Sequence, residues 1–318
     1  MTNLIFSLNA TMPLFLMMVA GWLLKKYNWL NDDTVEKLNR IVFRIFLPCL
    51  LFEDLYDKDF VAMWDGSFVA FCFGVTAVSI LVTMLFSKVF GREDRGEFIQ
   101  ASYRSAAATL GLAFMTNIYD DSSMMGLMIL GSVPLYNIVA VIVLSLTAQD
   151  ASEMSANKDM AGLMKKTLKN LVTNPIILSI IIGMAWSLLK LPLPTIAETS
   201  INYMGRMASP LTLIALGASF EFKDLKEKAL PVVAICFNKL ILWCAAFLPL
   251  AVYMGFRNEK LVAALIMLGS GTTSSSYVMA RNMGHNGVIS SSAVMITTLL
   301  SSFTFATWLF VLKSLGYI

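Results

Sequence analysis

The stretch LIMLGSGTTSSSYVMA, residues 265–280, sets a run of glycine, serine and threonine (269–276) in the middle of an apolar segment. Glycine is a poor helix former, and serine and threonine compete for backbone hydrogen bonds. At membrane depth, irregular backbone survives only inside protein or beside a wet cavity. The run therefore predicts a broken membrane helix whose freed backbone groups and hydroxyls bind a solute. A tight helix–helix seam of small residues is the alternative.

The composition of the whole chain agrees with a membrane setting. Of 318 residues, 57% are hydrophobic and 14% are charged, whereas a soluble domain carries roughly 25% charged residues. The net charge is only +3, with most lysines and arginines in short loops, so no nucleic-acid partner is expected. The sequence contains no catalytic triad, no phosphate-binding glycine loop and no metal-ligand spacing among its four cysteines. We therefore expect no enzyme, no metal site and no cofactor.

Apolar runs of about 20 residues, the length that crosses a bilayer, recur ten times. Lysine and arginine are concentrated in alternate loops, which places both termini outside and the longest loop in the cytoplasm. We therefore expect a multi-pass protein of the cell (inner or plasma) membrane. The predicted spans are Leu4–Leu24, Thr34–Leu55, Ser67–Val89, Phe98–Ile118, Ser123–Leu146, Thr167–Leu189, Thr195–Phe220, Ala229–Met254, Leu261–Asn282 and Val288–Leu315.

The two halves of the chain share features at one constant offset of 162 residues. Two prolines, a glycine and an arginine match without a gap, as the pairs Pro13/Pro175, Gly21/Gly183, Arg44/Arg206 and Pro48/Pro210. Coincidence is the alternative to a real repeat. Five spans in each half would put the halves in opposite orientations, which is the inverted repeat of many secondary transporters. The predicted division is a first repeat (1–147), a cytoplasmic linker (148–166) and a second repeat (167–318).

The fourth span holds the counterpart of the polar run in the ninth. It reads YRSAAATLGLAF, residues 103–114, and is rich in small residues around Gly111. Taken alone, its alanines also suit a plain packing face. Taken with the ninth span, it predicts a pair of interrupted helices that meet at a binding site near the membrane midplane.

Four cations are predicted inside spans: Arg44, Arg104, Arg206 and Lys239. All acidic residues lie in loops or near span ends, so these cations have no obvious acidic partner at depth. A bound anion would supply the missing charge, and arginine suits a carboxylate because its planar group donates two parallel hydrogen bonds. Snorkelling of the charged heads toward the membrane surface is the alternative.

These patterns define a candidate site for an organic anion. Backbone donors at the two breaks and nearby hydroxyls would hold a carboxylate, an amide in the fifth span would support the crossing, and one arginine would attract the anion. The predicted substrate-binding residues are Arg104, Gly111, Leu112, Ala113, Asn137, Gly271, Thr272, Thr273 and Ser274. The remaining cations, Arg44, Arg206 and Lys239, would line the cavity or hold the scaffold.

Several longer stretches resemble the auxin efflux carrier family. They are LNRIVFRIFLPCLLFEDL (38–55), PLYNIVAV (134–141), NPIILSIIIGMAWSLLKLPLP (174–194), ASPLTLIALGASF (208–220) and SSSYVMARNMGHN (274–286). That family includes plant auxin carriers and bacterial permeases for malate or malonate. The resemblance covers essentially the whole chain, and the paired sixth and seventh spans are its most specific part.

The resemblance implies an all-α polytopic membrane protein with ten helices in two inverted five-helix repeats. Spans 1, 2, 6 and 7 would form a scaffold through which such carriers form homodimers. Spans 3–5 and 8–10 would form a mobile, elevator-like transport unit, with helices 4 and 9 broken and crossing at the substrate. The chain departs from the family in its fourth span, where RSN and GLP are replaced by Arg104–Ala106 and Gly111–Ala113. In the ninth span, Gly271 stands at the position of the crossover proline.

The predicted function is a secondary transporter that carries a small organic anion, a carboxylate, by alternating access. An anion channel or a non-transporting membrane receptor on the same fold is the alternative. Sodium coupling, through carbonyls and hydroxyls near 269–276, and uniport both stay open. Because no carboxylate is expected at depth, the sequence disfavours a proton relay.

Overall fold

The computed structural model describes residues 2–58, 64–107, 115, 118–119, 123–148 and 160–318. Within these residues every regular element is a helix. The α-helices are α1 (Thr2–Lys26), α2 (Asp32–Ile41), α3 (Leu47–Tyr56), α4 (Gly66–Phe86), α5 (Arg92–Tyr103), α7 (Ser123–Thr147), α9 (Met160–Thr173), α10 (Pro175–Leu188), α11 (Thr195–Ala218), α12 (Phe222–Glu227), α13 (Ala229–Phe237), α14 (Trp243–Tyr253), α15 (Asn258–Gly269), α16 (Ser275–Asn282) and α17 (Val288–Ser314). The π-helical turns η1 (Val42–Phe46) and η3 (Asn238–Leu242) join α2 to α3 and α13 to α14, and the short helix η2 (Ser87–Val89) extends α4.

Several of the described helices are long and apolar enough to cross a membrane. Four qualify by themselves: Gly66–Val89, Met124–Thr147, Ala229–Tyr253 and Val288–Ser314. A fifth span is reached when α9 and α10, which are bent by 51° relative to each other, are taken together. These helices agree with a polytopic membrane protein.

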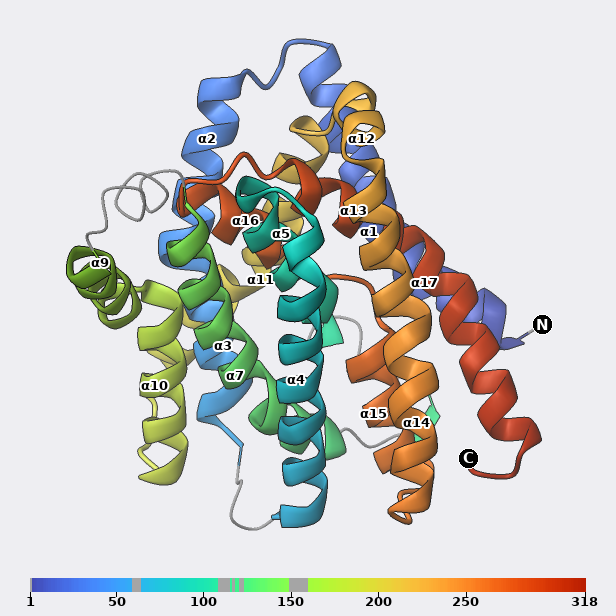
Figure 1. Cartoon of the computed structure of the whole chain (residues 1–318). Coiled ribbons are helices and arrows are strands. Elements are labelled where there is room, and N and C mark those ends of the chain that lie inside the picture. Colours follow the sequence, from blue (N-terminus) through green and yellow to red (C-terminus); the bar gives the residue numbers. More distant parts are fainter. Residues whose placement is uncertain (1, 59–63, 108–114, 116–117, 120–122, 149–159) are drawn as a thin grey trace.

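The predicted sixth span, Thr167–Leu189, is not one straight helix. The chain bends at Asn174 because Pro175 has no backbone N–H to continue the hydrogen-bond ladder. The side chain of Asn174 caps α10 instead and accepts from the amide of Ile176 at 3.0 Å. Helix α9 begins at Met160, inside the segment predicted as a linker, and Figure 1 views it nearly end-on while α10 descends beside it.

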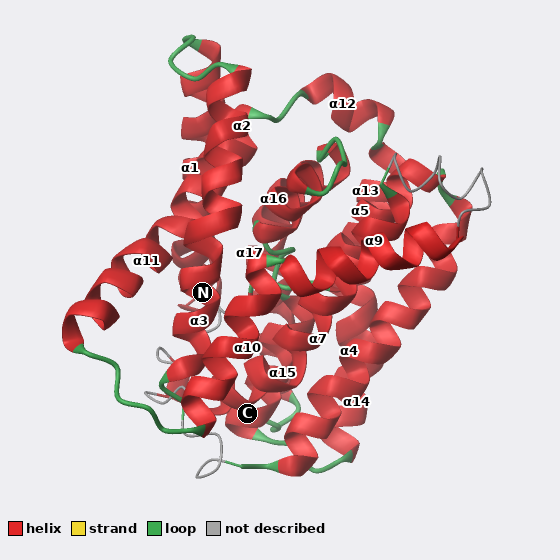
Figure 2. Cartoon of the chain, turned by 90° about the vertical axis from the view of Figure 1, so that its left-hand side faces the viewer, coloured by secondary structure: helices red, strands yellow, loops and turns green. Residues whose placement is uncertain are grey.

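Packing divides most of the helices into two groups (Figures 1 and 2). In the first group, α1 lies along α11, and α3 lies against both α10 and α11. The second group is built around α7, which packs against α4, α5 and α15, and it also contains α13, α14, α16 and α17. Helix α17 also runs along α1, so the two groups are in contact on that side.

Two glycines make equivalent close approaches within the first group. A Cβ added to Gly21 in α1 would lie 2.1 Å from the carbonyl oxygen of Ile214 in α11. A Cβ added to Gly183 in α10 would lie 3.2 Å from the carbonyl oxygen of Phe52 in α3. Phe52 and Ile214 are separated by the same 162 residues as the two glycines. The glycines thus let two related helix pairs pack backbone to backbone.

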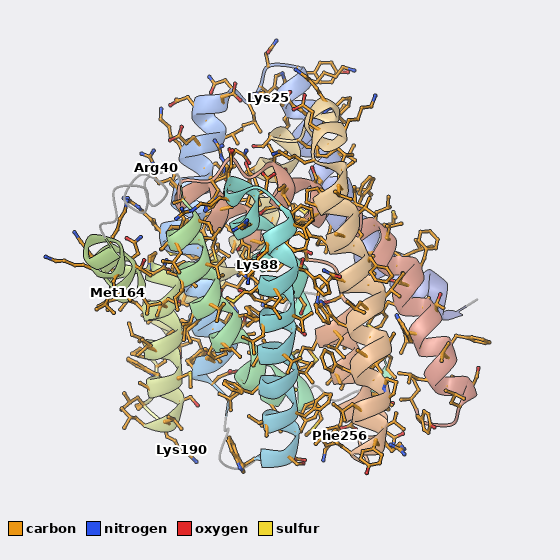
Figure 3. The ribbon with its side chains drawn as sticks, in the orientation of Figure 1. Lys25, Arg40, Lys88, Met164, Lys190 and Phe256 are labelled. Atoms are coloured by element: carbon orange, nitrogen blue, oxygen red, sulfur yellow. The ribbon has the colours of Figure 1, made fainter. Side chains whose placement is uncertain are left out.

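The basic residues mark the two ends of the bundle. Figure 3 places Lys25 and Arg40 at one end, and Lys190 at the opposite end together with Phe256. Lys25 belongs to a loop predicted to be cytoplasmic, and Lys190 to a loop predicted to be outside. The helical arrangement therefore separates these two loops as the charge pattern requires.

Residues 92–97 lie between two predicted spans but are not a loop. They form the first turns of α5, where two acidic residues suit the positive end of the helix dipole. The carboxylate of Glu97 is buried and accepts hydrogen bonds from the amides of Gly287 and Ser290, each at 2.8 Å. The acid therefore caps α17, a long-range role that its neighbours in sequence do not indicate.

Candidate binding site at two crossing helix breaks

Two helix interruptions meet inside the molecule. Helix α5 ends at Tyr103, and residues 104–106 are not helical; α15 ends at Gly269, and α16 begins at Ser275. The amide of Ala106 donates to the carbonyl of Gly271 at 2.9 Å, which joins the two breaks directly. The break in the fourth span thus begins before Gly111, around which the sequence predicted it.

Gly271 and Thr272 fix this crossing against the neighbouring helices. A Cβ on Gly271 would lie 3.1 Å from backbone atoms of Thr298 in α17, so a larger residue there would press against α17. Thr272 is 1% exposed; its hydroxyl donates to the carbonyl of Ala101 at 2.8 Å, and its amide donates to the hydroxyl of Thr297 at 2.9 Å. The hydroxyl of Thr272, predicted to bind substrate, is therefore engaged in holding α5 and α15 together.

Arg104 lies at the first break and is 1% exposed. Its guanidinium donates to Gln100 Oε1 at 3.1 Å, Met279 Sδ at 2.8 Å, Asn137 Oδ1 at 2.9 Å and Ser275 Oγ at 2.8 Å. It also lies 5.5 Å from the centre of the Tyr136 ring. Every one of these partners is neutral, and Nε has no hydrogen-bond partner within the described residues. The positive charge is therefore held in place without being neutralised.

Asn137 and Gln100 orient this arginine. Asn137 donates from Nδ2 to the carbonyl of Val133 at 2.9 Å, which turns its oxygen toward Arg104. Gln100 donates from Nε2 to the carbonyl of Ser276 at 2.9 Å and likewise presents its oxygen to Arg104. Both amides are buried. Asn137 therefore lies at the crossing, as predicted, and its observed contact is with Arg104.

The start of α16 adds free backbone donors to the same place. In the described part of the chain, no acceptor is bound to the amides of Thr273, Ser274 or Ser275. The hydroxyls of Thr273 and Ser275 lie 3.1 Å apart. A helix N-terminus carries partial positive charge and unpaired N–H groups, which favour an anion. Its position beside Arg104 reinforces that preference.

A cavity joins Arg104 and the α16 terminus to the first helix group. Its volume of about 40 Å³ is close to the roughly 30 Å³ that one water molecule occupies in the liquid. It must widen before a larger molecule can enter. The cavity is lined by Leu47, Leu50, Leu51 and Asp54 of α3; Arg104, Ser105 and Ala106 of the first break; Val133, Tyr136 and Asn137 of α7; Ile176 of α10; Ser209 of α11; and Thr273, Ser274 and Ser275 of the second break.

Lys239 lies away from this cavity and has a different role. It is 1% exposed, and its ammonium donates to the carbonyls of Met267 and Leu268, both at 3.1 Å. These are among the last carbonyls of α15, where a cation is favourable. Lys239, predicted as a cavity or scaffold cation, is thus the C-terminal cap of α15, the first helix of the predicted ninth span.

Two wider cavities lie at the end of the molecule that carries Arg40 (Figure 3). Arg44 lines both of them; their volumes are about 510 and 430 Å³. One is also lined by Phe43, Asn170, Thr173, Asn174, Pro175, Asn282 and Met283, and the other by Glu36, Asn39, Arg40, Arg281 and Asn282. Arg206, which matches Arg44 in the predicted repeat, is exposed on α11 and lines none of these cavities.

The predicted site differs from the observed one in two ways: some predicted residues lie outside the described residues, and some observed residues were not predicted. Gly111, Leu112 and Ala113 lie outside the described residues. The predicted site lacks four residues that surround Arg104 or line the cavity: Gln100, Ser105, Tyr136 and Ser275. It also lacks Asp54, which lies near the end of a predicted span. Two of these residues could have been found from the sequence. Gln100 lies four residues before Arg104, and Ser275 lies inside the polar run. No local signal pointed to Asp54.

Comparison with known proteins places the chain among transporters rather than enzymes. A family model described as "membrane transport protein" matches residues 6–309. An "uncharacterized transporter" of Methanothermobacter thermautotrophicus is 19% identical over 312 residues, which cover 96% of this chain and 98% of the relative. A "putative malonate transporter" of Rhizobium meliloti is 24% identical over 320 residues, which cover 95% of each chain.

Proposed function

The chain belongs to the membrane transport protein family, and from this premise we propose that it is a secondary transporter for a small organic anion, a carboxylate. The anion would bind where the breaks in the fourth and ninth spans cross. The relative from Rhizobium meliloti that is named for malonate supports the carboxylate class.

The observation that carries this proposal is the buried, uncompensated guanidinium of Arg104. Its hydrogen-bond partners are all neutral, yet it lines a cavity. A buried cation that no acidic group contacts directly is costly, and an incoming carboxylate that pairs with it lowers the cost. Arginine also offers the bidentate geometry that a carboxylate prefers. The Nε–H has no acceptor among the described residues, so such a pair would require the exchange of one Nη2 hydrogen bond, such as the one to Ser275.

The N-terminus of α16 would complete the carboxylate site. The free amides of Thr273, Ser274 and Ser275 lie on the opposite break from Arg104 and line the same cavity. The hydroxyls of Thr273 and Ser274 are available there, since both side chains are only partly buried. One carboxylate would therefore contact groups from both halves of the chain.

We propose alternating access with ten spans in two inverted repeats, the first helix group serving as scaffold and the second as an elevator-like transport unit. The matched approaches of Gly21 to Ile214 and of Gly183 to Phe52 support the repeat. The small cavity lies between the two groups, so a sliding motion of one group past the other would open and close it. This relation supports an elevator.

The wide cavities lined by Arg44 support a state that is open toward the cytoplasm. They lie at the end of the molecule carrying Arg40 and Lys25, which the charge rule assigns to the inside. An arginine at such a mouth raises the local concentration of anions. We propose that the protein lies in the cell membrane with both termini outside, and that it forms a homodimer through the scaffold helices.

Counterflow in proteoliposomes tests this function. Vesicles loaded with unlabelled malonate are diluted into a trace of radiolabelled malonate, and accumulation is followed over time. A carrier accumulates label transiently because substrate on the far side speeds the return of its binding site, whereas a channel does not. Arg104→Gln should remove counterflow, and the exposed Arg206→Gln should keep it. No counterflow with malonate, malate or succinate would contradict a carboxylate carrier.

A further inference from the structure

Asp54 is the one acidic residue among the described residues that line the cavity together with Arg104. It lies near the end of α3, in the first helix group, while Arg104 belongs to the second. Its Oδ2 atom is buried and has no hydrogen-bond partner in the described part of the chain. An ionised carboxylate in such a place is costly unless something donates to it. The lining therefore contains one cationic and one acidic side chain, which come from different helix groups.

The charged and titratable groups around Asp54 leave this acceptor free. On its own helix and the turn after it, Glu53 accepts a hydrogen bond from Asn202 of α11, and Asp57 lies 3.0 Å from Lys58. Tyr56 donates to Glu198 of α11 at 2.8 Å. The other titratable groups that line the same cavity are Arg104 and Tyr136. The phenol of Tyr103 is already bonded to the carbonyl of Tyr136 at 3.1 Å.

This polarity bears on which anions fit. A molecule with one carboxylate at Arg104 and the α16 amides would turn its other end toward Asp54. A second carboxylate there would face a like charge in a poorly hydrated space, which is unfavourable. A hydroxyl, an amide or a protonated carboxyl would instead donate a hydrogen bond to the free oxygen of Asp54. The site thus contains an attractive and a repulsive element, the combination that creates specificity.

We propose that Asp54 is the specificity-determining residue of the carrier and selects monoanions whose far end donates a hydrogen bond over fully ionised dicarboxylates. This inference rests on the proposed function and sharpens its substrate class. A dicarboxylate would then bind as its monoprotonated form. The proton it carries would be donated to Asp54 as a hydrogen bond and would stay with the substrate.

Three ligands of nearly equal size separate the alternatives. Malonamate carries one carboxylate and an amide donor, monomethyl malonate carries one carboxylate and no donor, and malonate at pH 8 is a dianion. Binding to the purified full chain at pH 8 is measured by thermal stabilisation, and uptake at the same pH is measured by competition with radiolabelled malonate. The matching succinate series extends the test to longer molecules. Wild type should prefer malonamate to both other ligands by about tenfold or more, the usual worth of a hydrogen bond to a charged group.

Asp54→Asn should reverse the ranking, because its amide nitrogen can donate to the second carboxylate of the dianion. Asp57→Asn, on the exposed turn three residues later, is the matched control and should keep the wild-type order. Asp54→Ser, a shorter side chain, should lose the discrimination without reversing it. It also serves as the test if the asparagine variant does not fold.

Two outcomes would overturn the inference: equal binding of malonate dianion and malonamate by wild type, or an unchanged ranking in both Asp54 variants. Failure of the proposed function looks different. In that case no carboxylate of either series stabilises wild type at any pH.

Discussion

Ala106 and Gly271 share a backbone hydrogen bond of 2.9 Å, although they come from opposite halves of the chain. Each residue belongs to a break in a helix, where backbone groups have lost their usual partners. The bond satisfies one donor and one acceptor and leaves the neighbouring amides of α16 free to face the cavity. The candidate site therefore exists only when both broken helices are in place.

Replacing Arg104 by glutamine should lower carboxylate uptake by about tenfold or more, because charge-assisted hydrogen bonds contribute roughly 1.5–3 kcal/mol. Glutamine keeps polar atoms near Asn137 and Ser275 but removes the charge. The measurement is initial uptake in proteoliposomes, with gel filtration to confirm folding. Arg206→Gln removes an exposed arginine from another predicted span and should transport normally. Wild-type uptake by Arg104→Gln would refute the role of the guanidinium.

Adding one methyl group at Gly271 should disturb the crossing. The new Cβ would lie 3.1 Å from the backbone of Thr298, and overpacking of this kind costs about 1–3 kcal/mol. Gly271→Ala should therefore lower both the melting temperature and the uptake rate. Gly74→Ala in α4 is the control, since a Cβ there meets no atom within 4 Å. Equal stability of the two variants would argue against the close approach.

The two threonines of the second break should respond differently to valine. Thr272→Val removes a buried hydrogen bond to Ala101 and should cost about 1–3 kcal/mol in stability, because that carbonyl loses its buried donor. Thr273 lines the cavity and is partly exposed, so Thr273→Val should raise KM for the carboxylate and leave the melting temperature nearly unchanged. Paired thermal melts and uptake curves check this. If Thr272→Val raised KM and Thr273→Val lowered the melting temperature, the hydroxyl that contacts the substrate would be that of Thr272 and not that of Thr273.

The glycines of the first helix group should rank by how close their neighbours lie. Gly21→Ala would set a Cβ 2.1 Å from the carbonyl oxygen of Ile214, whereas Gly183→Ala would set one 3.2 Å from that of Phe52. The first pair must separate, while the second requires a small adjustment. Melting temperatures should therefore fall in the order wild type, Gly183→Ala, Gly21→Ala. An unchanged melting temperature of Gly21→Ala would contradict the tight contact between α1 and α11.

Asp65, just before α4, offers a pH-dependent test. Its hydrogen bond from Lys260 and a second from Ser67 hold the pKa of Asp65 well below its usual range. A lowered folded-state pKa contributes stability above the unfolded value of about 3.9, and this is lost as pH falls through the folded value. Asp65→Asn keeps a helix-capping side chain but loses the ion pair. Its deficit in melting temperature should be full at pH 7 and should shrink only in strongly acidic buffer.

Combining Asp65→Asn with Lys260→Met provides the control for this pair. If the two side chains act together, the double variant should be little worse than either single one. A deficit that stays constant even in strongly acidic buffer would rule out the carboxylate charge as its source.

The sequence by itself determined where the helices lie and where the ninth span breaks. Apolar runs, prolines and the Gly-Ser-Thr run act on the backbone within a few residues, so their effect is local and can be read along the chain. The same holds for Arg104, whose charge inside an apolar span demanded a partner. Two features of the helices were not predicted from the sequence: the bend at Asn174 and the helical turns formed by residues 92–97. Both lie at helix boundaries, where local preference is weak.

Only the tertiary structure decided how the polar side chains are used. Thr272 and Thr273 are adjacent and chemically alike, yet one hydroxyl holds the crossing and the other lines the cavity. Lys239 caps α15, and Asp54 comes to the same cavity as Arg104. These roles depend on which distant backbone group or side chain arrives beside each residue. Hydrogen bonds and charges are satisfied across helix contacts, and the pattern along one helix does not specify its neighbours.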